Sequence, residues 1–290
     1  AETVSYFRWR QCPYGQEQMH SGLHLPDNTK SPAYFEIKKL GDELKNSNLV
    51  DCGNSKIAII FDYDANAAWN IQPHGLNLNY FKLIFDVYRA FRKLGQSIDI
   101  LSTSHLDFSD YKIVFVPGLI NMRADLKKVL ASFNGQIFFG PRTSTRDENL
   151  NTPIPLPPNI PNFDARVVLT ESFRSDSPVE LELGGYFYNY REKLEGTARV
   201  IERTVSGDPA ILCEGNVTYI SGCLDQIALR RIILSALENA KIQSYSLPIG
   251  VRVRETSKER FWFNYSAITQ QVPSKMLRPG EVLIERLRAN

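Results

Sequence analysis

The sequence contains few cysteines, and they do not follow a metal-binding or disulfide pattern. Only Cys12, Cys52, Cys213 and Cys223 occur among 290 residues, and no two of them form a C-x-x-C pair. A structural zinc site usually takes its ligands from such pairs, so none is expected, and four cysteines are too few for a disulfide scaffold. We therefore expect unpaired thiols in a reducing, cytoplasmic environment.

Neither an excess of charge nor a long apolar run is present. Lys and Arg number 34 and Asp and Glu 32, which gives a formal net charge of +2. This balance gives no electrostatic reason to expect a nucleic acid or an anionic membrane as partner. No apolar run has the length of a membrane span, and the start lacks a signal-peptide pattern. Because the chain begins with Ala1 rather than Met, we expect residue 1 to be a cut or cloning boundary.

The motifs that bind phosphate or carry a nucleophile are missing as well. After the apolar run KIAIIFDY the chain continues DANAAWNIQPHG, and neither G-x-G-x-x-G nor G-x-x-x-x-G-K-[ST] occurs anywhere. A dinucleotide or P-loop site is therefore not expected, and no cofactor is predicted. An amidotransferase would place a cysteine in a turn such as FFGPRTSTRDENL, which instead contains Ser144 and Thr145, and G-x-S-x-G is absent. We expect this region to be catalytically silent.

What the sequence does contain divides into three zones. The first ends near residue 54 in a polar, turn-rich stretch, and Ser31-Pro32 predicts the start of a helix over AYFEIKKLGDELKN. The second, 55–243, alternates buried-type strands such as KIAIIFDY and DYKIVFVPG with helices such as LNYFKLIFDVYRAFRKLG, where Gly95 is placed to end the helix. This order predicts an α/β fold with an open, mostly parallel sheet and helices on both faces.

The third zone, 244–290, contains GVRVRET, RFWFNYS and EVLIERL, separated by turns. Three alternating segments of this kind predict a small antiparallel β domain.

A metal site near the N-terminus is considered and set aside. His20 and His24 are spaced i, i+4 with Glu17 one turn earlier, which on a helix would provide two zinc ligands and a carboxylate. Leu25-Pro26 follows at once and would end a helix, and H-E-x-x-H is absent. From the residues alone, Glu17 is better explained by a surface ion pair and His20 by helix packing, so no metal site is predicted.

The opening segment YFRWRQ, followed by GQEQMHSGLHLPD, resembles glycoside hydrolase family 42, the bacterial β-galactosidases. In that family an F-R-W-R-Q strand closes an eight-stranded (β/α) barrel, and a short E-x-x-H segment follows. KIAIIFDYDANAAW, DFSDYKIVFVPGL and FFGPRTSTRDENL resemble the family's trimerisation domain, an amidotransferase-like fold without amidotransferase residues. RFWFNYS resembles its small C-terminal β domain.

This resemblance covers essentially the whole chain and implies three domains. Residues 1–54 would be the last strand and helices of a truncated (β/α)8 barrel. Residues 55–243 would form an amidotransferase-like (flavodoxin-like) trimerisation domain, and 244–290 the C-terminal β domain. The alternative is a stand-alone amidotransferase-like or flavodoxin-like binding protein without catalytic activity, whose opening resembles the hydrolase by descent.

The resemblance also implies a division of labour within a longer enzyme. Retaining hydrolysis needs two carboxylates roughly 5–5.5 Å apart, and in the family both glutamates end barrel strands upstream of YFRWRQ. The chain is thus expected to contain no catalytic residue and to be the C-terminal, non-catalytic fragment of a retaining β-galactosidase. Self-association, as a homotrimer, is its expected task.

The family's E-x-x-H contacts galactose and maps onto Glu17 and His20, which are the predicted substrate-binding residues. A carboxylate and an imidazole suit sugar hydroxyls as acceptor and donor. Gln16 stands where some members have an aromatic residue. Phe7 and Trp9 are expected to pack in the barrel's core or shell, and Arg8 and Arg10 to form buried or interfacial ion pairs.

The candidate anchors of the trimer interface are two aromatic residues and two arginines. Tyr63 and Trp69 follow the first strand of the second zone, and Arg142 and Arg146 lie in GPRTSTR. Aromatic and arginine side chains commonly anchor interfaces. Both segments are expected at the C-terminal edge of the parallel sheet.

Overall fold

The computed structural model describes residues 4–45, 53 and 55–287. The chain forms two compact units, Ala1–Gly53 and Asn54–Asn290. Most of the turn-rich stretch that ends the first zone, including Cys52, lies outside the described residues. The three other cysteines have free thiols, as predicted.

In the first unit the regular element is helix α1 (Pro32–Lys45), which begins where Ser31-Pro32 predicted. The strand predicted over YFRWRQ is not formed. Only Arg10 makes an isolated bridge, to His24. A strand needs the backbone groups of a neighbouring strand along its length, whereas the backbone hydrogen bonds of this segment reach only Leu23 and His24 among the described residues.

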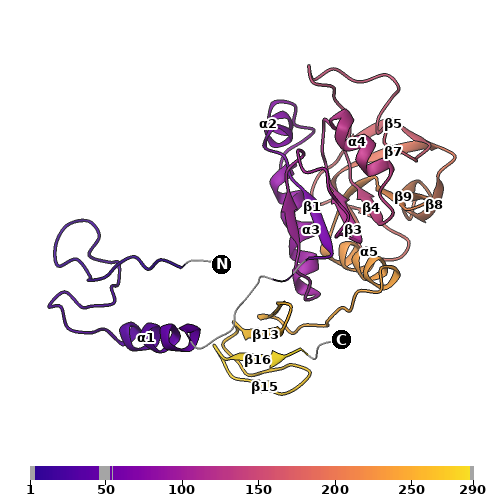
Figure 1. Ribbon diagram of the computed structural model, residues 1–290. Helices are drawn as coiled ribbons and strands as arrows, with labels where there is room; N and C mark the ends of the chain where they lie inside the picture. The colour runs from indigo at the N-terminus through magenta and orange to yellow at the C-terminus, as the bar shows by residue number, and fades with distance from the viewer. Residues whose placement is uncertain (1–3, 46–52, 54, 288–290) are drawn as a thin grey trace. The chain divides into compact units, whose positions relative to one another are not determined.

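The centre of the second unit is a seven-stranded mixed sheet with the order β2-β1-β3-β4-β10-β9-β8 (Figure 1). Its parallel part consists of β2 (Asp99–Leu101), β1 (Ile57–Ile60), β3 (Ile113–Val116), β4 (Gln136–Phe139) and β10 (Val217–Ile220). Its antiparallel part consists of β9 (Pro209–Glu214) and β8 (Arg199–Arg203). All residues of β1 and β3 are buried, as their continuous apolar runs predicted.

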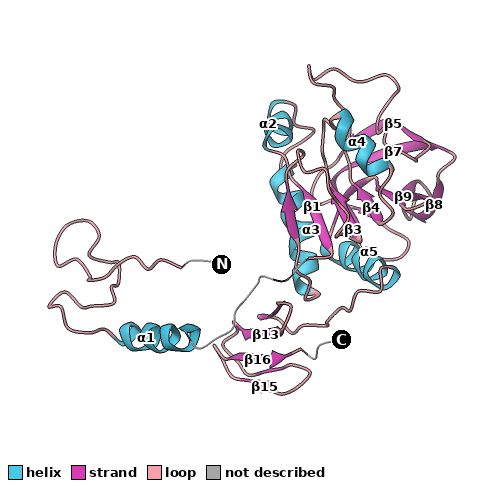
Figure 2. Cartoon of the chain, in the orientation of Figure 1, coloured by secondary structure: helices cyan, strands magenta, loops and turns pink. Residues whose placement is uncertain are grey.

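Helices flank this sheet (Figure 2). They are α2 (Tyr63–Ile71), α3 (Tyr80–Lys93), α4 (Ala124–Ala131) and α5 (Gln226–Asn239). The side chain of Asn79 caps α3 by accepting from the Lys82 N–H at 2.9 Å. Gly95 follows the last turn with φ +79°, the left-handed conformation that its predicted role as helix stop requires. Helix α2 was not predicted; it begins after Asp62, whose carboxylate accepts from two N–H groups of its first turn.

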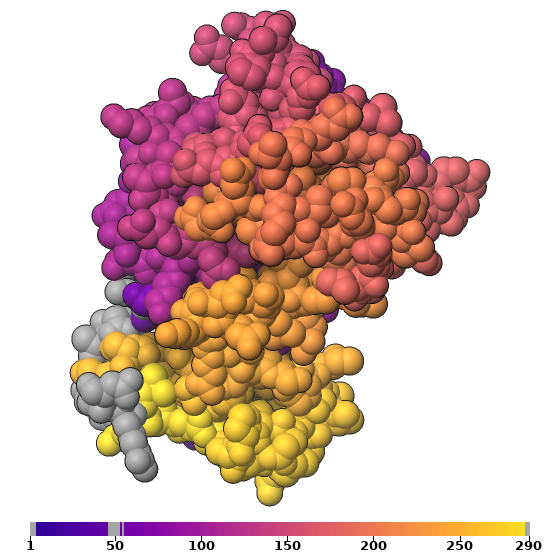
Figure 3. Space-filling model, turned by 90° about the vertical axis from the view of Figure 1, so that its right-hand side faces the viewer, coloured from indigo at the N-terminus to yellow at the C-terminus, as the bar shows by residue number. Residues whose placement is uncertain are grey.

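A second, antiparallel sheet takes most of its strands from the insertion between β4 and β10. It is formed by β5 (Ala165–Ser172), β7 (Tyr186–Gly196) and β11 (Gly222–Leu224), which follows β10 in the chain, and β6 (Val179–Glu180) pairs with β7. The segments from β5 to α5, rose to amber in the space-filling view, form a large part of the face that Figure 3 turns to the reader. Strand β7 brings a charged residue into the interior of the unit, as described below.

The C-terminal segment forms its own small antiparallel sheet, as predicted. Its strands are β12 (Val251–Glu255), β13 (Glu259–Asn264) and β16 (Val282–Arg286), with a short pair β14 (Gln270–Gln271) and β15 (Met276–Leu277) beside them. Trp262 is the largest side chain of its separate core. Among the helices of the described residues, none is both long and apolar enough to span a membrane.

Candidate functional site

Glu17 and His20 lie together in one exposed turn of the first unit. The backbone N–H of His20 donates to the Glu17 carbonyl at 3.1 Å, which closes the turn. The Arg8 guanidinium donates to Glu17 Oε2 at 2.9 Å, so Arg8 forms an ion pair, although it lies at the surface of this chain and is not buried. The edge of the His20 imidazole contacts Phe7, with ring centroids 6.1 Å apart. Glu17 and His20 therefore belong to one turn, and both residues are exposed.

His24 does not join this pair. Its Nδ1 lies 2.9 Å from the Asn28 carbonyl oxygen, and its ring stacks on Trp9 with centroids 4.7 Å apart. Residues 4–45, 53 and 55–287 contain no group of three or more His, Cys, Asp or Glu side chains that could hold a metal ion.

Phe7 and Trp9, which are expected to pack in the core or shell of the barrel, are exposed in this chain. Their exposed fractions are 69% and 63%. Among the described residues, the Phe7 ring contacts the ring of His20 and the Trp9 ring that of His24, and the segment around them is a loop.

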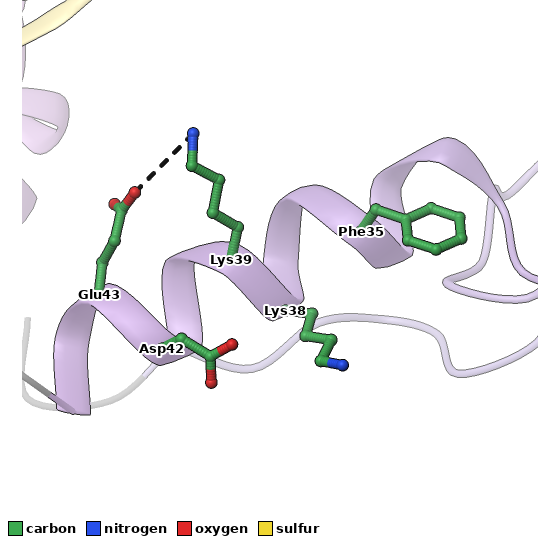
Figure 4. A pocket seen from close by; sticks show the side chains of 5 residues that line it. All are labelled: Phe35, Lys38, Lys39, Asp42 and Glu43. Atoms are coloured by element: carbon green, nitrogen blue, oxygen red, sulfur yellow. Dashed lines mark ion pairs between the residues drawn. The ribbon is translucent and has the colours of Figure 1, made fainter.

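A hollow beside α1 is a second place to consider (Figure 4). Its lining comes from α1 alone: Phe35, Lys38, Lys39, Asp42 and Glu43. Lys39 and Glu43 extend from one side of the helix as a 3.9 Å ion pair whose side chains are 74% and 63% exposed. The charges are solvated and do not converge on one point, so this hollow is an ordinary helix surface.

The loops after β1, β3 and β4 meet at the C-terminal edge of the parallel strands, as predicted for the two anchor segments. The Trp69 indole N–H donates to the Gly118 carbonyl at 2.9 Å, which joins α2 to the loop after β3. The Arg142 guanidinium lies over the Trp69 ring, 4.4 Å from its centroid, and donates to the Gln72 carbonyl at 2.7 Å. Arg146 Nε donates to Gln72 Oε1 at 2.6 Å.

The structure nevertheless contradicts two of the four predicted anchors. Trp69 and Arg142 are each only 1% exposed, so neither is available to another protomer. They fill the place beside the ends of β1 and β3 where the strand order reverses, which is where sheets of this kind bind ligands. Tyr63 is 78% exposed and Arg146 is half-buried.

Glu192, which the sequence did not reveal as a candidate, is buried beneath this edge and connects its residues through hydrogen bonds. Its carboxylate accepts from the Arg142 backbone N–H at 2.8 Å, the Tyr190 hydroxyl at 3.0 Å and the Tyr219 hydroxyl at 2.7 Å. Burial raises the pKa of Glu192 to about 7, although these hydrogen bonds act in the opposite direction. Its position on β7, in step with Tyr190 and Leu194, was the available signal that it faces inward.

The groups around Glu192 do not form a nucleophilic site. Burial raises the pKa of the nearby Cys223 thiol to about 12, so it stays protonated and unreactive at neutral pH. Burial lowers the pKa of His74, and the positive charges of Arg142 and Arg146 lower it further. The cluster therefore orders loops rather than activating a group.

Three sequence models of one enzyme match the chain in succession. Residues 55–243 match a model described as the β-galactosidase trimerisation domain. Residues 1–47 match one described as β-galactosidase, and residues 250–287 match the β-galactosidase C-terminal domain.

The individual proteins that resemble this chain are also described as β-galactosidases. β-Galactosidase BgaA of Thermus sp. is 31% identical over 279 residues, which are 94% of this chain and 43% of that protein. The crystal structure of β-galactosidase from the psychrophilic Marinomonas ef1 is 30% identical with a TM-score of 0.89, over 99% of this chain and 47% of that one. The β-galactosidase of the Antarctic haloarchaeon Halorubrum lacusprofundi is 25% identical with a TM-score of 0.87, over 97% of this chain and 47% of that one. The chain thus spans less than half the length of these relatives.

Proposed function

The chain belongs to glycoside hydrolase family 42, the β-galactosidases, and from this membership we propose that it is the C-terminal, non-catalytic part of a retaining β-galactosidase. The observation that carries the proposal is the continuous match, which covers 94% of this chain but only 43% of the Thermus enzyme. The family resemblance assigns both catalytic glutamates to the part of the enzyme that this chain does not span. The alternative of a stand-alone binding protein is not favoured, because residues 1–47 and 250–287 match domains of the same enzyme.

Its first proposed task is assembly into a homotrimer through residues 55–243. The match of this region to a trimerisation domain supports self-association. An amidotransferase-like class is supported by the parallel strand order β2-β1-β3-β4-β10, which corresponds to the flavodoxin-like order 2-1-3-4-5. The ligand position of that fold is occupied by Trp69 and Arg142, so a role other than catalysis fits this domain better.

The second proposed task is to complete the sugar site of the whole enzyme with Glu17 and His20. Their closeness in one exposed turn and the Arg8 contact that orients the Glu17 carboxylate support this role. We propose that residues 1–54 belong to the end of the catalytic barrel and that 244–290 form the C-terminal domain. A cytoplasmic location stays a prediction.

An activity assay tests the non-catalytic character. We expect no hydrolysis of nitrophenyl β-galactoside by the purified chain above buffer background, because the carboxylate pair is assigned elsewhere. The longer enzyme, prepared in the same way, is the positive control. Saturable turnover that co-purifies with the 290-residue chain would show that a carboxylate pair exists within it.

A further inference from the structure

Five aromatic side chains lie along the start of α2 and one side of α3, in two groups of contacting rings. Phe61 contacts Tyr63 with ring centroids 4.8 Å apart and Phe81 at 6.1 Å. Phe81 and Phe85 are four residues apart on α3, so they lie one turn apart on the same side, and Phe85 stacks on Tyr88 at 6.4 Å. We call Phe61, Tyr63, Phe81, Phe85 and Tyr88 the aromatic stripe.

The aromatic stripe is open to solvent although α3 already buries its opposite side in the core. Tyr63, Phe81 and Phe85 are 78%, 60% and 48% exposed. Helices of soluble proteins usually have one apolar side, and an apolar second side indicates that something else covers it. Since a large aromatic side chain presents about 150–250 Å², these three leave roughly 350–400 Å² of apolar surface. One partner in a standard interface contributes about 800 Å², with its apolar part at the centre.

The charges beside the stripe are already paired within the chain. Lys82 Nζ lies 2.5 Å and Arg89 3.1 Å from carboxylate oxygens of the buried Asp86. The Arg89 guanidinium lies over the Phe85 ring, 5.8 Å from its centroid. Because the two cations share the Asp86 carboxylate, this group of three keeps a net charge of only one beside the aromatic rings, which favours a protein surface as partner over a nucleic acid or another polyanion.

We propose that the aromatic stripe is the surface through which this chain binds a second copy of itself. This inference rests on the proposed assembly role. The stripe belongs to the region that matches a trimerisation domain, and its area is that of an interface centre. Rotational assembly of three copies is head-to-tail, so the stripe of one protomer meets a different surface of the next. Trp69 and Arg142 cannot form this interface, because they are buried in their own protomer.

Light scattering over a concentration series, with the complete chain, is the first test. The wild type is expected at three times the 33.0 kDa chain mass. The double variant Phe81→Glu/Phe85→Glu is expected to raise the dissociation constant at least tenfold, because it places charges in the apolar centre. The matched control is Phe35→Glu/Leu40→Glu on α1, which changes two apolar positions that are 58% and 42% exposed and should leave the oligomer intact. Circular dichroism verifies that each variant is folded.

The outcomes separate the two proposals. A wild type that stays monomeric at every concentration overturns the assembly role and the stripe contact with it. A trimeric wild type with an equally trimeric stripe variant overturns the stripe alone. A photo-crosslinking benzoylphenylalanine at Phe81 gives a readout without charge insertion. Cross-linked pairs of chains support the proposal, whereas cross-links only within one chain show that another segment of that chain covers the stripe.

Discussion

Glu192 combines complete burial with three hydrogen-bond donors, and the two influences act on its pKa in opposite directions. Burial dominates and raises the pKa from an ordinary 4.5 to about 7. Between these two values the folded state binds more protons than the unfolded state. The stability that Glu192 contributes in its protonated form is therefore fully present below about pH 4.5 and is lost as the pH rises through about 7.

This sign gives a prediction for the substitution Glu192→Gln. A neutral amide keeps the shape and can accept from Tyr219, but it does not titrate, so the free energy of unfolding should depend less steeply on pH. Between pH 5 and 7.5 the wild type should lose up to about 3 kcal/mol more than the variant, at 1.36 kcal/mol per pKa unit. Urea titrations followed by tryptophan fluorescence measure this, with the exposed Glu148→Gln as control. Parallel pH profiles for wild type and Glu192→Gln would contradict the argument.

At Glu17 and His20 the prediction concerns sugar binding in the longer enzyme. Glu17→Gln and His20→Ala should each lower kcat/KM by roughly 1–3 kcal/mol of transition-state binding, because each loses a hydrogen bond to a sugar hydroxyl. Steady-state kinetics on a galactoside provides the measurement. Met19→Ala, in the same turn and 85% exposed, is the control. If both variants keep the wild-type kcat/KM, Glu17 has only its ion pair with Arg8 and His20 only its contact with Phe7.

Between elements, Gly118 packs closely against side chains of α2 and α3 at the sheet edge. A Cβ there would come within 2.8 Å of Trp69 Cζ2 and 3.0 Å of Leu83 Cδ2, and φ is +65°. Gly118→Ala should therefore add steric overlap to backbone strain and cost about 2–5 kcal/mol. Gly184→Ala is the matched control, because it has φ +90° but open space around the added atom, and it should cost only about 1–2 kcal/mol. If thermal denaturation shows the same loss of stability for Gly118→Ala and Gly184→Ala, the contact between Gly118 and Trp69 leaves room for a methyl group.

The elements that the sequence predicted are those whose signals are local. The apolar runs of β1 and β3 and the capped, periodic segment of α3 each specify one conformation through their own residues. Helix α2 was missed because YDANAAWNI lacks a strong apolar period, although Asp62 is a suitable cap. The strand over YFRWRQ was implied by the family resemblance and is not formed, because a strand exists only with a partner strand.

In the candidate site, too, the residues that the sequence could predict are those close together in the chain. Glu17 and His20 are close in sequence and so are close in space, which a motif can predict. Glu192 gathers Arg142 and Tyr219 from distant strands, and no short stretch of sequence contains that arrangement. Trp69 and Arg142 have the composition of interface anchors, and only the fold reveals that they pack on each other inside one protomer.

For the molecule as a whole, the two cores of the second unit differ greatly in size. The small C-terminal core consists of Val251, Val253, Trp262, Val272 and Leu277. Domains of about 40 residues seldom fold without a disulfide, a metal or a partner surface. Here the partner surface is the end of α3: Arg92 donates to the Val253 carbonyl at 3.2 Å, and the Tyr245 N–H donates to the Leu94 carbonyl at 3.1 Å.

This dependence predicts a graded stability within one chain. Amide hydrogens of β12 and β13 should exchange faster than those of β1 and β3, because opening the small core exposes little apolar surface. Arg92→Met removes the hydrogen bond to Val253 and should speed exchange in β12 and β13 further, while β1 and β3 keep their protection. Hydrogen exchange read by mass spectrometry distinguishes the segments, and Lys93→Met, an exposed neighbour on the same helix, is the control. If Arg92→Met lowers protection uniformly across the second unit, the C-terminal domain and the large sheet unfold as one, and the end of α3 is not the contact on which the small domain depends.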